Sequence, residues 1–422
     1  MGISQITEPL EPFKPCICIG LRVFLPPISA YSYLFPYLVI GYILKSHKIR
    51  LYPTDEQQVF FAKSFGCARF IWNKMLVDKI DHYKTTKTTL NNTPAQYKKE
   101  FEWLKEVDSL ALANVQQNLR ASYSKFFKQG AGFPKFKKKG IKDSYTTNNQ
   151  KGSVAVTKNT VKLPKIGHIK VKIHQSVNGL IKSATISRTP SGKYYVSLLI
   201  ETIVNELPKT HSNIGIDLGL TDFIVLSDGS KVANPKFLSK LQAKLAREQK
   251  ILAKRRAAAK ADQRKLSESR NYQKQRIKVA KVYEQITNSR KDFLHKLSFN
   301  LIKNHDVIAI EDLNIKGMVK NRKLAKAISD SSWSAFTTML TYKADWYGKA
   351  LVKIDRWYPS SKTCSNCDHL LNKAELPLSV RTWDCPSCLQ KNDRDINASI
   401  NILNQGLLLA KQSKTVGATG LA

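Results

Sequence analysis

An aspartate interrupts an apolar run between Ile214 and Leu220, which reads IGIDLGL. The run is typical of a strand followed by a tight turn at Gly219, and the next segment, TDFIVLSDG, is typical of a second strand pairing back on the first. A carboxylate buried in such a strand is costly unless it is paired or binds a metal ion. Asp217 therefore predicts that other ligands converge on it from elsewhere in the chain.

Two further acids fit this requirement. Glu311 ends an apolar strand predicted at Val307–Ile310, and Asp395 stands near the start of a helix predicted in DRDINASINI, residues 393–402. Hard cations such as Mg²⁺ prefer carboxylate oxygens. Two such ions about 3.5–4 Å apart can activate water and stabilise the leaving oxygen in phosphodiester cleavage. We therefore predict that Asp217, Glu311 and Asp395 are catalytic and bind two Mg²⁺ ions.

Two neighbouring acids are competing candidates. Asp393 competes with Asp395, but it is better placed to cap the helix that follows it. Asp312 follows the end of its strand directly, so we expect a turn residue there.

Seven cysteines are present, and the last four form two Cys-x-x-Cys pairs separated by residues 368–384, that is by 17 residues. An odd total with paired spacing favours metal ligands in a reducing compartment over a secreted disulfide framework. We predict one structural Zn²⁺ ion bound by Cys364, Cys367, Cys385 and Cys388. Asp368 and Leu389 directly follow the second cysteine of each pair, a position where glycine is common. This raises the question whether the backbone at these two residues adopts a conformation that glycine tolerates better.

The charge of the chain points to a polyanionic partner. The chain has 422 residues, enough for two or three domains, and 69 Lys and Arg against 32 acids give a net charge of +37. Such an excess disfavours a compact monomer unless a polyanion such as nucleic acid shares the space. In the loop FPKFKKKGIK, residues 133–142, we predict contacts to phosphates. Its candidate nucleic-acid-binding residues are Lys135, Lys137, Lys138 and Lys139. A solvated loop is an equal alternative.

Residues 1–44 differ in composition from the rest of the chain. No charged residue occurs from Val23 to Leu44, and the run is long enough to span a bilayer. Three prolines break the run, and nothing in it resembles a small-residue cleavage site. We expect an extension outside the fold with no membrane anchor at 23–44, and a cytoplasmic, nucleoid-associated protein of prokaryotic type.

Helical and strand patterns divide the chain before residue 209. Capping boxes at Thr54 and Thr93 predict two helix starts, and a third helix is predicted from Ser109 to about Phe127. Alternating apolar residues from Ser153 to Val204 predict an antiparallel meander or small barrel, which a strand at His47–Tyr52 would join. The helical domain would then interrupt the barrel. Further on, a basic helical hairpin is predicted from Pro235 to about Thr287, and a separate helix at Asp292–Ile302. The hairpin could lie along a nucleic-acid duplex or simply be solvated.

Seven segments together resemble the TnpB proteins of insertion-sequence transposons, which are relatives of the type V CRISPR effectors. They are KIRLYPT (48–54), FGCARFIWN (65–73), GIDLGL (215–220), IEDLNIKGM (310–318), YPSSKTCSNC (358–367), CPSC (385–388) and DRDINASINI (393–402). The resemblance covers almost everything from residue 45 to about 405. It implies a nuclease that a transposon-derived RNA guides to DNA beside a short transposon-adjacent motif, with its three catalytic acids at Asp217, Glu311 and Asp395.

With the resemblance, the expected fold class is α/β and multidomain. It combines a RuvC/RNase H-like nuclease domain, which contains an inserted Cys₄ zinc ribbon, with an antiparallel β-barrel interrupted by a helical domain. The expected domains are an extension at 1–44, a wedge-like barrel at 45–54 and 130–208, a helical recognition domain at 55–129, a nuclease domain at 209–360 and 393–405, a zinc ribbon at 361–392, and a tail at 406–422.

Three functions compete at this point. The first is an RNA-guided, Mg²⁺-dependent DNA endonuclease that uses two metal ions, with a guide RNA from the transposon end, a double-stranded DNA target and no small-molecule substrate. The second is a catalytically silent RNA- and DNA-binding relative that acts as a regulator; the intact set of three acids favours the first. The third, a transposase that joins DNA strands, ranks last because the sequence shows no tyrosine nucleophile motif paired with a His-x-His metal site.

Overall fold

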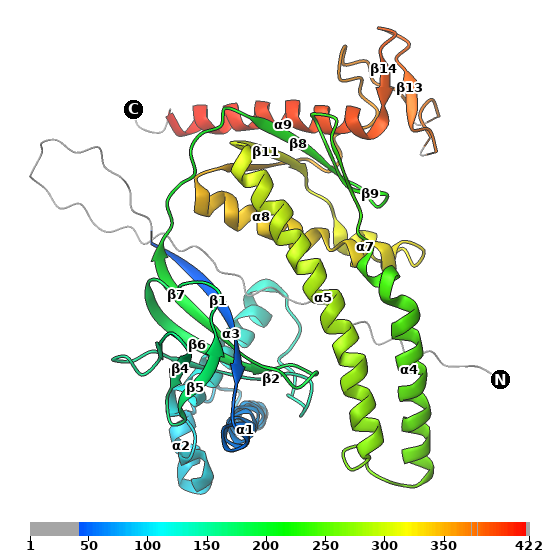
Figure 1. Ribbon diagram of the computed structural model, residues 1–422. Coiled ribbons are helices and arrows are strands. Elements are labelled where there is room, and N and C mark those ends of the chain that lie inside the picture. The colour runs from blue at the N-terminus through cyan, green and yellow to red at the C-terminus, as the bar shows by residue number, and fades with distance from the viewer. Residues whose placement is uncertain (1–41, 373, 378, 419–422) are drawn as a thin grey trace, which may run out of the picture. The chain divides into compact units, whose positions relative to one another are not determined.

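The computed structural model describes residues 42–372, 374–377 and 379–418, with side chains to residue 412 (Figure 1). The chain divides into two compact units. The N-terminal unit comprises residues 42–203 and 273–280, and the C-terminal unit comprises residues 204–272 and 281–418. The predicted extension lies outside the described residues except for 42–44. Within the described residues, no helix is long and apolar enough to cross a membrane.

The N-terminal unit contains a seven-stranded antiparallel half-barrel sheet with the order β2-β6-β7-β1-β5-β4-β3. Its strands are β1 (Tyr42–Tyr52), β2 (Asp143–Asn148), β3 (Ala155–Val156), β4 (Thr160–Leu163), β5 (Gly167–Lys172), β6 (Leu180–Arg188) and β7 (Tyr194–Ile203). The helices α1 (Asp55–Thr86), α2 (Pro94–Glu100) and α3 (Ser109–Gln129), with a 3₁₀ turn at Glu102–Lys105, lie between β1 and β2 in the chain. The helical segment thus interrupts the sheet, in the order that the sequence predicts.

Local sequence explains these elements. Both predicted capping boxes form, at Thr54 with Gln57 and at Thr93 with Gln96. Along β7, alternate residues from Tyr194 to Ile200 are buried, as expected for a sheet with one face on a core. The helices and the sheet share that core, because Phe61 and Met75 of α1 belong to the same buried cluster as the strands. The assignment of residues 42–44 to the extension is wrong. These residues form the start of β1, where Tyr42 pairs with Ile203.

The C-terminal unit contains a five-stranded sheet with the order β10-β9-β8-β11-β12. The strands β8 (Asn213–Leu218), β9 (Asp222–Leu226) and β10 (Lys231–Ala233) form an antiparallel meander, and β11 (Val307–Glu311) runs parallel to both β8 and β12 (Ala350–Ile354). A small hairpin of β13 (Thr382–Asp384) and β14 (Lys391–Asp393) lies in the segment with the cysteine pairs.

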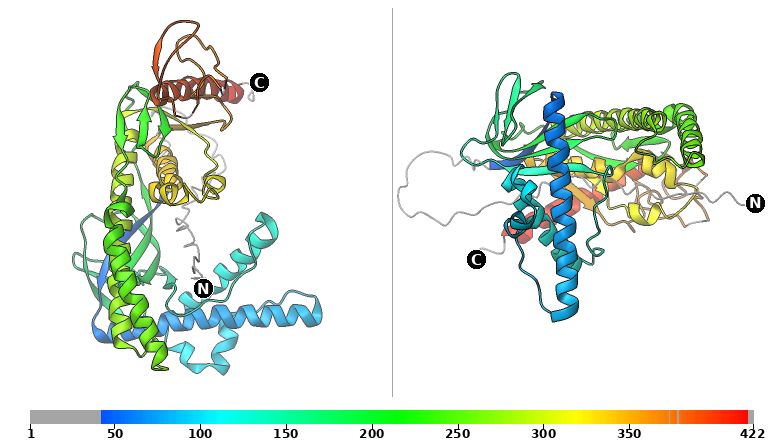
Figure 2. Two further views of the ribbon diagram at one scale, coloured as in Figure 1. Left: turned by 90° about the vertical axis from the view of Figure 1, so that its right-hand side faces the viewer. Right: turned by 90° about the horizontal axis from the view of Figure 1, so that it is seen from below.

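Helices cover both faces of this sheet (Figures 1 and 2). The helices of this unit are α4 (Phe237–Ala261), α5 (Arg270–Asn304), α6 (Ile315–Met318), α7 (Ala325–Ser331), α8 (Trp333–Tyr347) and α9 (Arg394–Ala418). All except α4 contribute residues that pack against the sheet. Buried residues of α5, α7 and α8, such as Leu301, Ile328 and Phe336, pack with Ile216 and Ile310 on one face. On the opposite face Ile402 of α9 packs with Ala309 and Ile354.

Two helices are longer than predicted. The expected break between residues 287 and 292 does not occur, and α5 is one helix of 35 residues. It contains no proline or glycine to end it, so the basic stretch and the apolar stretch continue without interruption. The prediction of a separate tail from residue 406 is also wrong as far as residue 418. The helix α9 continues to Ala418, and Leu409 packs against the buried cluster of Ala309, Ile354 and Ile402.

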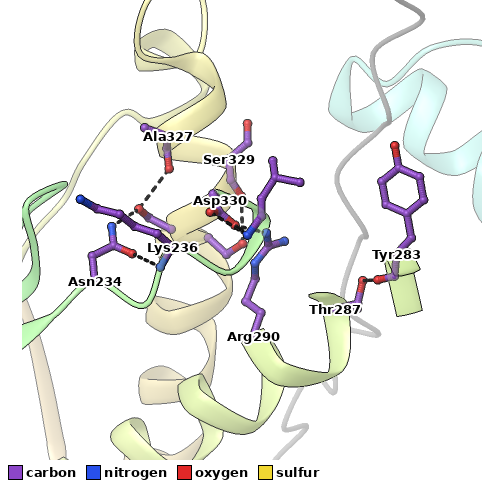
Figure 3. Close-up of polar contacts among 11 residues, drawn as sticks. Asn234, Lys236, Tyr283, Thr287, Arg290, Ala327, Ser329 and Asp330 are labelled. Atoms are coloured by element: carbon purple, nitrogen blue, oxygen red, sulfur yellow. Dashed lines mark hydrogen bonds and ion pairs between the residues drawn. The ribbon is translucent and has the colours of Figure 1, made fainter. Parts of the chain in front are cut away.

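Asp330 of α7 ties α4 to α5 (Figure 3). Lys236, the residue before α4, has a left-handed backbone with φ 48° and provides no side-chain cap. The Asp330 carboxylate replaces that cap: it accepts from the Leu238 N–H at 3.1 Å and pairs with the Arg290 guanidinium. Such an acceptor satisfies an otherwise unpaired donor and suits the positive end of the helix dipole. The helical hairpin is therefore fixed to α7 at its base.

Glycine at two positions allows α9 to lie close against the sheet. A Cβ at Gly215 in β8 would stand 2.0 Å from the carbonyl oxygen of Ser399 in α9. A Cβ at Gly406 in α9 would stand 2.4 Å from the Cβ of Ala309 in β11. Both distances lie far inside van der Waals contact, so any side chain at either position would push α9 away from the sheet.

Gly215→Ala is expected to destabilise the C-terminal unit by about 2–3 kcal/mol, because overpacking a tight interior forces the backbone to shift. Urea denaturation measures the change. Gly66→Ala is the control: a Cβ at Gly66, inside α1, meets nothing within 4 Å. Alanine in a helix interior is favoured over glycine, so this variant should gain up to about 1 kcal/mol. Equal effects of the two variants would contradict the proposed packing constraint.

Candidate active site and cysteine cluster

The sheet register brings Asp217 and Glu311 together. β8 and β11 are parallel, and Ile216 pairs with Ile310, so the next residue of each strand occupies the same level at the carboxyl edge. Side chains alternate between the faces of a sheet, so Asp217 shares a face with Gly215 and Glu311 shares a face with Ala309. Gly215 and Ala309 are the residues that α9 contacts. Both carboxylates therefore belong to the face that α9 covers.

Asp395 comes to the same face from the first turn of α9. The preceding Asp393 caps this helix, since its Oδ1 accepts from the N–H groups of Asp395 and Ile396 at 3.0 and 3.1 Å. The prediction that Asp393 is a capping residue is thus confirmed. Asp312 is occupied elsewhere: its carboxylate pairs with Arg356 at 3.0 Å and with Lys353 at 3.8 Å.

Burial and the two neighbouring acids act on the carboxyl group of Asp217. The Asp217 residue is partly open to solvent, yet its pKa is raised to about 7 by burial of the carboxyl and, to a lesser extent, by the charges of Glu311 and Asp395. Burial also raises the pKa of Glu311, against the effect of a hydrogen bond from Ser360. Like charges at partly buried positions favour protonation unless a cation compensates them. The site thus suits a hard divalent cation, whose preferred ligands are carboxylate oxygens.

Arg381 is the cation that contacts the cluster in the described structure, with Nη1 at 3.4 Å from Oδ1 of Asp395. Its side chain is well exposed, so the contact is weak. The oxygen atoms of the three carboxylates do not lie as close to one another as the ligands of one metal ion do. Among the described residues, the His, Cys, Asp or Glu side chains that do lie this close together are the four cysteines.

Ser360 is a site residue that the sequence analysis missed. Its hydroxyl donates to Oε1 of Glu311 at 2.6 Å. Its carbonyl oxygen accepts from the side-chain amide of Asn401 at 2.8 Å, and the carbonyl oxygen of Thr363 accepts from those of Asn397 and Asn401 at 2.7 and 2.6 Å. Asn397 and Asn401 are four residues apart and so share a face of α9. Two asparagines at this spacing near the start of α9 were the available signal.

The four predicted cysteine ligands do come together, with all their sulfur atoms within 4.8 Å of one another. Sγ of Cys364 lies 3.7 Å from that of Cys388, and Sγ of Cys367 lies 3.6 Å from that of Cys385. A tetrahedron with zinc–sulfur bonds of about 2.3 Å has edges of about 3.8 Å, so the thiols fit a metal ion of this size. Asn397 also accepts from the Ser365 N–H at 2.8 Å, which links the first cysteine pair to α9.

The two cysteine turns share one backbone geometry. The N–H groups of Asp368 and Leu389 donate at 2.9 Å to the carbonyl oxygens of Cys364 and Cys385, respectively. Both donors have left-handed backbones, with φ 58° at Asp368 and φ 60° at Leu389. The question that the sequence raised at these positions is thus answered: both residues adopt a conformation that glycine tolerates better. Aspartate visits this region more readily than leucine does.

The four candidate lysines of the N-terminal unit divide into two kinds. Lys137 is held against α1: its Nζ lies 3.8 Å from the centroid of the Trp72 ring, and Asn73 hydrogen-bonds both its N–H and its carbonyl oxygen. Burial of the amino group, then the charge of Lys142, lowers its pKa to about 8 although the residue as a whole remains exposed. The other three, Lys135, Lys138 and Lys139, are exposed and have no ion pair to an acid in the described residues.

Comparison with known proteins supports the fold. The chain matches three family models. They are described as "Probable transposase" (residues 194–322), "Cas12f1-like, TNB domain" (333–402) and "Helix-turn-helix domain" (43–88). That last segment forms β1 and the single long helix α1 in this structure. The solved structure titled "Cryo-EM structure of the Cas12f1-sgRNA-target DNA complex" has a TM-score of 0.56 at 13% identity, and the match covers 86% of this chain and 99% of that one.

The fold and the carboxylate face thus define a multidomain α/β protein that shares its fold with Cas12f1. A Streptomyces pristinaespiralis protein named "Putative RNA-guided DNA endonuclease" is 35% identical over 380 residues, 86% of this chain and 90% of its own. The Escherichia coli protein InsQ, similarly named, is 29% identical over 386 residues, 86% of this chain and 92% of its own. The chain belongs to the TnpB family.

Ser360→Ala is expected to raise the pKa of Glu311, because the Ser360 hydrogen bond favours the ionised carboxylate. A carboxyl ¹³C NMR titration measures the shift, and Ser360→Thr, which keeps the hydroxyl group, should leave the titration close to that of the wild type. An unchanged Glu311 titration in the alanine variant would show that the hydrogen bond does not tune this group.

Leu389→Gly is expected to stabilise the cysteine segment by about 1 kcal/mol, because a leucine in the left-handed region costs about 1–2 kcal/mol. Retention of bound metal during a chelator titration measures the gain. Asp368→Gly serves as the matched variant and should gain less, since aspartate tolerates the conformation better. Faster metal loss from Leu389→Gly than from the wild type would contradict the strain argument.

Proposed function

We propose that this protein is an RNA-guided DNA endonuclease of an insertion-sequence transposon. In this proposal the C-terminal unit is a RuvC/RNase H-like nuclease domain, and Asp217, Glu311 and Asp395 are its catalytic residues. The observation that carries the proposal is the convergence of the three acids: two stand at the same level on adjacent parallel strands, and the third comes from the helix that covers that face. The names of the relatives support the same activity.

The catalytic acids would bind two Mg²⁺ ions. The donor set fits this cation, since it consists of carboxylate oxygens, and burial together with the charges of Glu311 and Asp395 raises the pKa of Asp217 to about 7. When bound, two such ions supply an activated water and stabilise the leaving oxygen of the cut phosphodiester. Because a proton competes with the cation for Asp217, the proposal implies that the site loads better above neutral pH than below it.

The chain's own residues would position this machinery. Ser360 orients Glu311 through its hydroxyl, and the Asp393 cap fixes the first turn of α9, from which Asp395 projects. Asn397 and Asn401 hold the Ser360 segment against α9, so the acids on β11 and on α9 are linked through buried hydrogen bonds. Catalytic groups need such support because small displacements from the productive geometry are costly in rate.

The four cysteines would form a zinc ribbon with a structural role. Four thiolates close the coordination shell, so the ion would stabilise the segment and would not act on a substrate. The sulfur spacing supports this part of the proposal. Through Asn397, the folded ribbon would hold the first turns of α9 in place.

RNA and DNA would both be partners of this chain. The net charge of +37 favours polyanions, and the solved structure with the same fold is titled as a complex with sgRNA and target DNA. In this proposal a guide RNA from the transposon end pairs with one strand of a double-stranded DNA target. Lys135, Lys138 and Lys139 would contact phosphates from the loop that Trp72 and Asn73 anchor, whereas Lys137 would mainly fix that loop to α1.

Asp217→Ala is expected to reduce guide-dependent plasmid cleavage by at least about a thousandfold, because several kcal/mol of metal-dependent stabilisation would be lost. The full chain would be co-produced with RNA from its transposon end and tested with Mg²⁺ on a plasmid with a randomised flank beside the target. Asp345→Ala changes an exposed acid of the same unit and should cut normally.

Two results of this experiment would count against the nuclease. Cutting that persists in Asp217→Ala would mean that the three acids are not the catalytic site. No cutting by the wild type, with guide RNA still tightly bound, would favour the second candidate, a nucleic-acid-binding regulator without nuclease activity.

A further inference from the structure

Trp357 is the most exposed large apolar side chain in the described part of the chain, with 84% of its surface accessible. Tryptophan is highly buried on average, so an indole presented to solvent to this extent is unusual. Within the described residues, Trp357 has no stacked ring and no cation over its face. The residue lies in the turn that follows β12, on the chain between the sheet and the first cysteine pair.

The turn that presents Trp357 is well ordered by hydrogen bonds. The Trp357 N–H donates to Oδ1 of Asp355 at 2.7 Å, and the Tyr358 N–H donates to the Asp355 carbonyl oxygen at 3.2 Å. Tyr358 packs against the cluster of Ala309, Ile354 and Ile402 beneath α9. The backbone on both sides of Trp357 is therefore anchored, and the indole is held out from a fixed base. A fixed aromatic group binds at a lower entropic cost than a mobile one does.

Both ends of the turn contact the strand that ends in Glu311. Ile354 pairs with Glu311 in the sheet, and the Ser360 hydroxyl donates to the Glu311 carboxylate. Trp357 is three residues from each of these anchors, so its Cα lies within about 11 Å of both. The turn that carries Trp357 thus lies at the carboxyl edge of the sheet, next to the end of the strand that carries Glu311.

Basic side chains lie next to the turn that carries Trp357. Arg356 and Lys353 flank it, and a single acid, Asp312, pairs with both of them. With Asp355 in the turn, two acids balance these two cations, so attraction for a polyanion comes from the chain as a whole, whose net charge is +37. A flat aromatic surface next to basic groups is the combination that binds unpaired nucleotides, since every base has a face that can stack.

We propose that Trp357 forms a stacking subsite for an unpaired base of the nucleic-acid strand that enters the carboxylate site. The proposal deepens the nuclease function and rests on it, because the subsite would hold the strand near the scissile phosphate. Stacking tolerates all four bases, so the subsite would position the strand without selecting a sequence. Trp357 in this role is a binding and positioning residue, and the three acids remain the catalytic ones.

The test uses full-length protein with Asp217→Ala as its background, so that oligonucleotides are bound and not cut. Single-stranded DNA and RNA oligonucleotides of the same sequence, labelled with a fluorophore, are titrated separately to learn which strand the subsite takes. Trp357→Ala should weaken binding of at least one of them by about five- to 150-fold, the range known for loss of one base–aromatic stack. Leu408→Ala, which removes another exposed apolar side chain of the same unit, should bind as the background protein does.

Two substitutions separate stacking from simple apolar contact. Trp357→Phe keeps an aromatic face and should restore most of the affinity, whereas Trp357→Leu keeps only apolar surface and should not. An oligonucleotide that contains 5-bromouracil, crosslinked by ultraviolet light and mapped by mass spectrometry, should attach at Trp357. Equal affinity of the alanine variant and the background protein, or equal rescue by leucine and phenylalanine, would overturn the stacking subsite; the latter result would point to a protein partner.

Guided cleavage in the wild-type background distinguishes this proposal from the nuclease proposal. If the wild type cuts and Trp357→Ala cuts equally well at limiting substrate, the stacking subsite is wrong and the nuclease stands. If the wild type does not cut, but oligonucleotide binding still depends on an aromatic residue at 357, the nuclease is wrong and the subsite stands as part of a binding protein.

Discussion

The close approach of α9 to the five-stranded sheet is the constraint on which the C-terminal unit depends. Gly215 and Gly406 have no side chains where the helix meets the strands, and a Cβ at either position would collide with the opposite element. This approach turns the face with Asp217 and Glu311 towards the helix that brings Asp395. Since like charges near one another are unfavourable without a cation, the packing that puts the acids on one face also makes that face suited to a cation.

The same helix connects the sheet to the cysteine cluster. Asn397 and Asn401 use their amide groups to hold the carbonyl oxygens of Ser360 and Thr363, while the Ser360 hydroxyl reaches Glu311. Buried amides of this kind must be satisfied, and satisfied networks fix one arrangement of the surrounding backbone. The conformation of the cysteine turns and the orientation of Glu311 are therefore physically linked.

Sequence reasoning succeeded where the pattern was local or its spacing strong. Capping boxes at Thr54 and Thr93, the Asp393 cap and the meeting of the four cysteines all follow from neighbouring residues and are confirmed. It failed to predict where two helices end. The helices α5 and α9 run on past their expected ends, because a helix continues while its face can pack and no residue stops it. It also treated four lysines alike, although Trp72 distinguishes Lys137.

By itself, the sequence determined which residues are acids in apolar strands, which cysteines are paired, and that the chain as a whole is strongly basic. The tertiary structure alone decided that Asp217 and Glu311 share a level and a face, that Ser360 reaches Glu311, and that Trp357 is left exposed beside them. The physical reason is the range of the interactions. Caps and turns act over three or four residues, whereas strand register and helix-to-sheet packing join positions that lie about a hundred residues apart, and no local pattern encodes such distances.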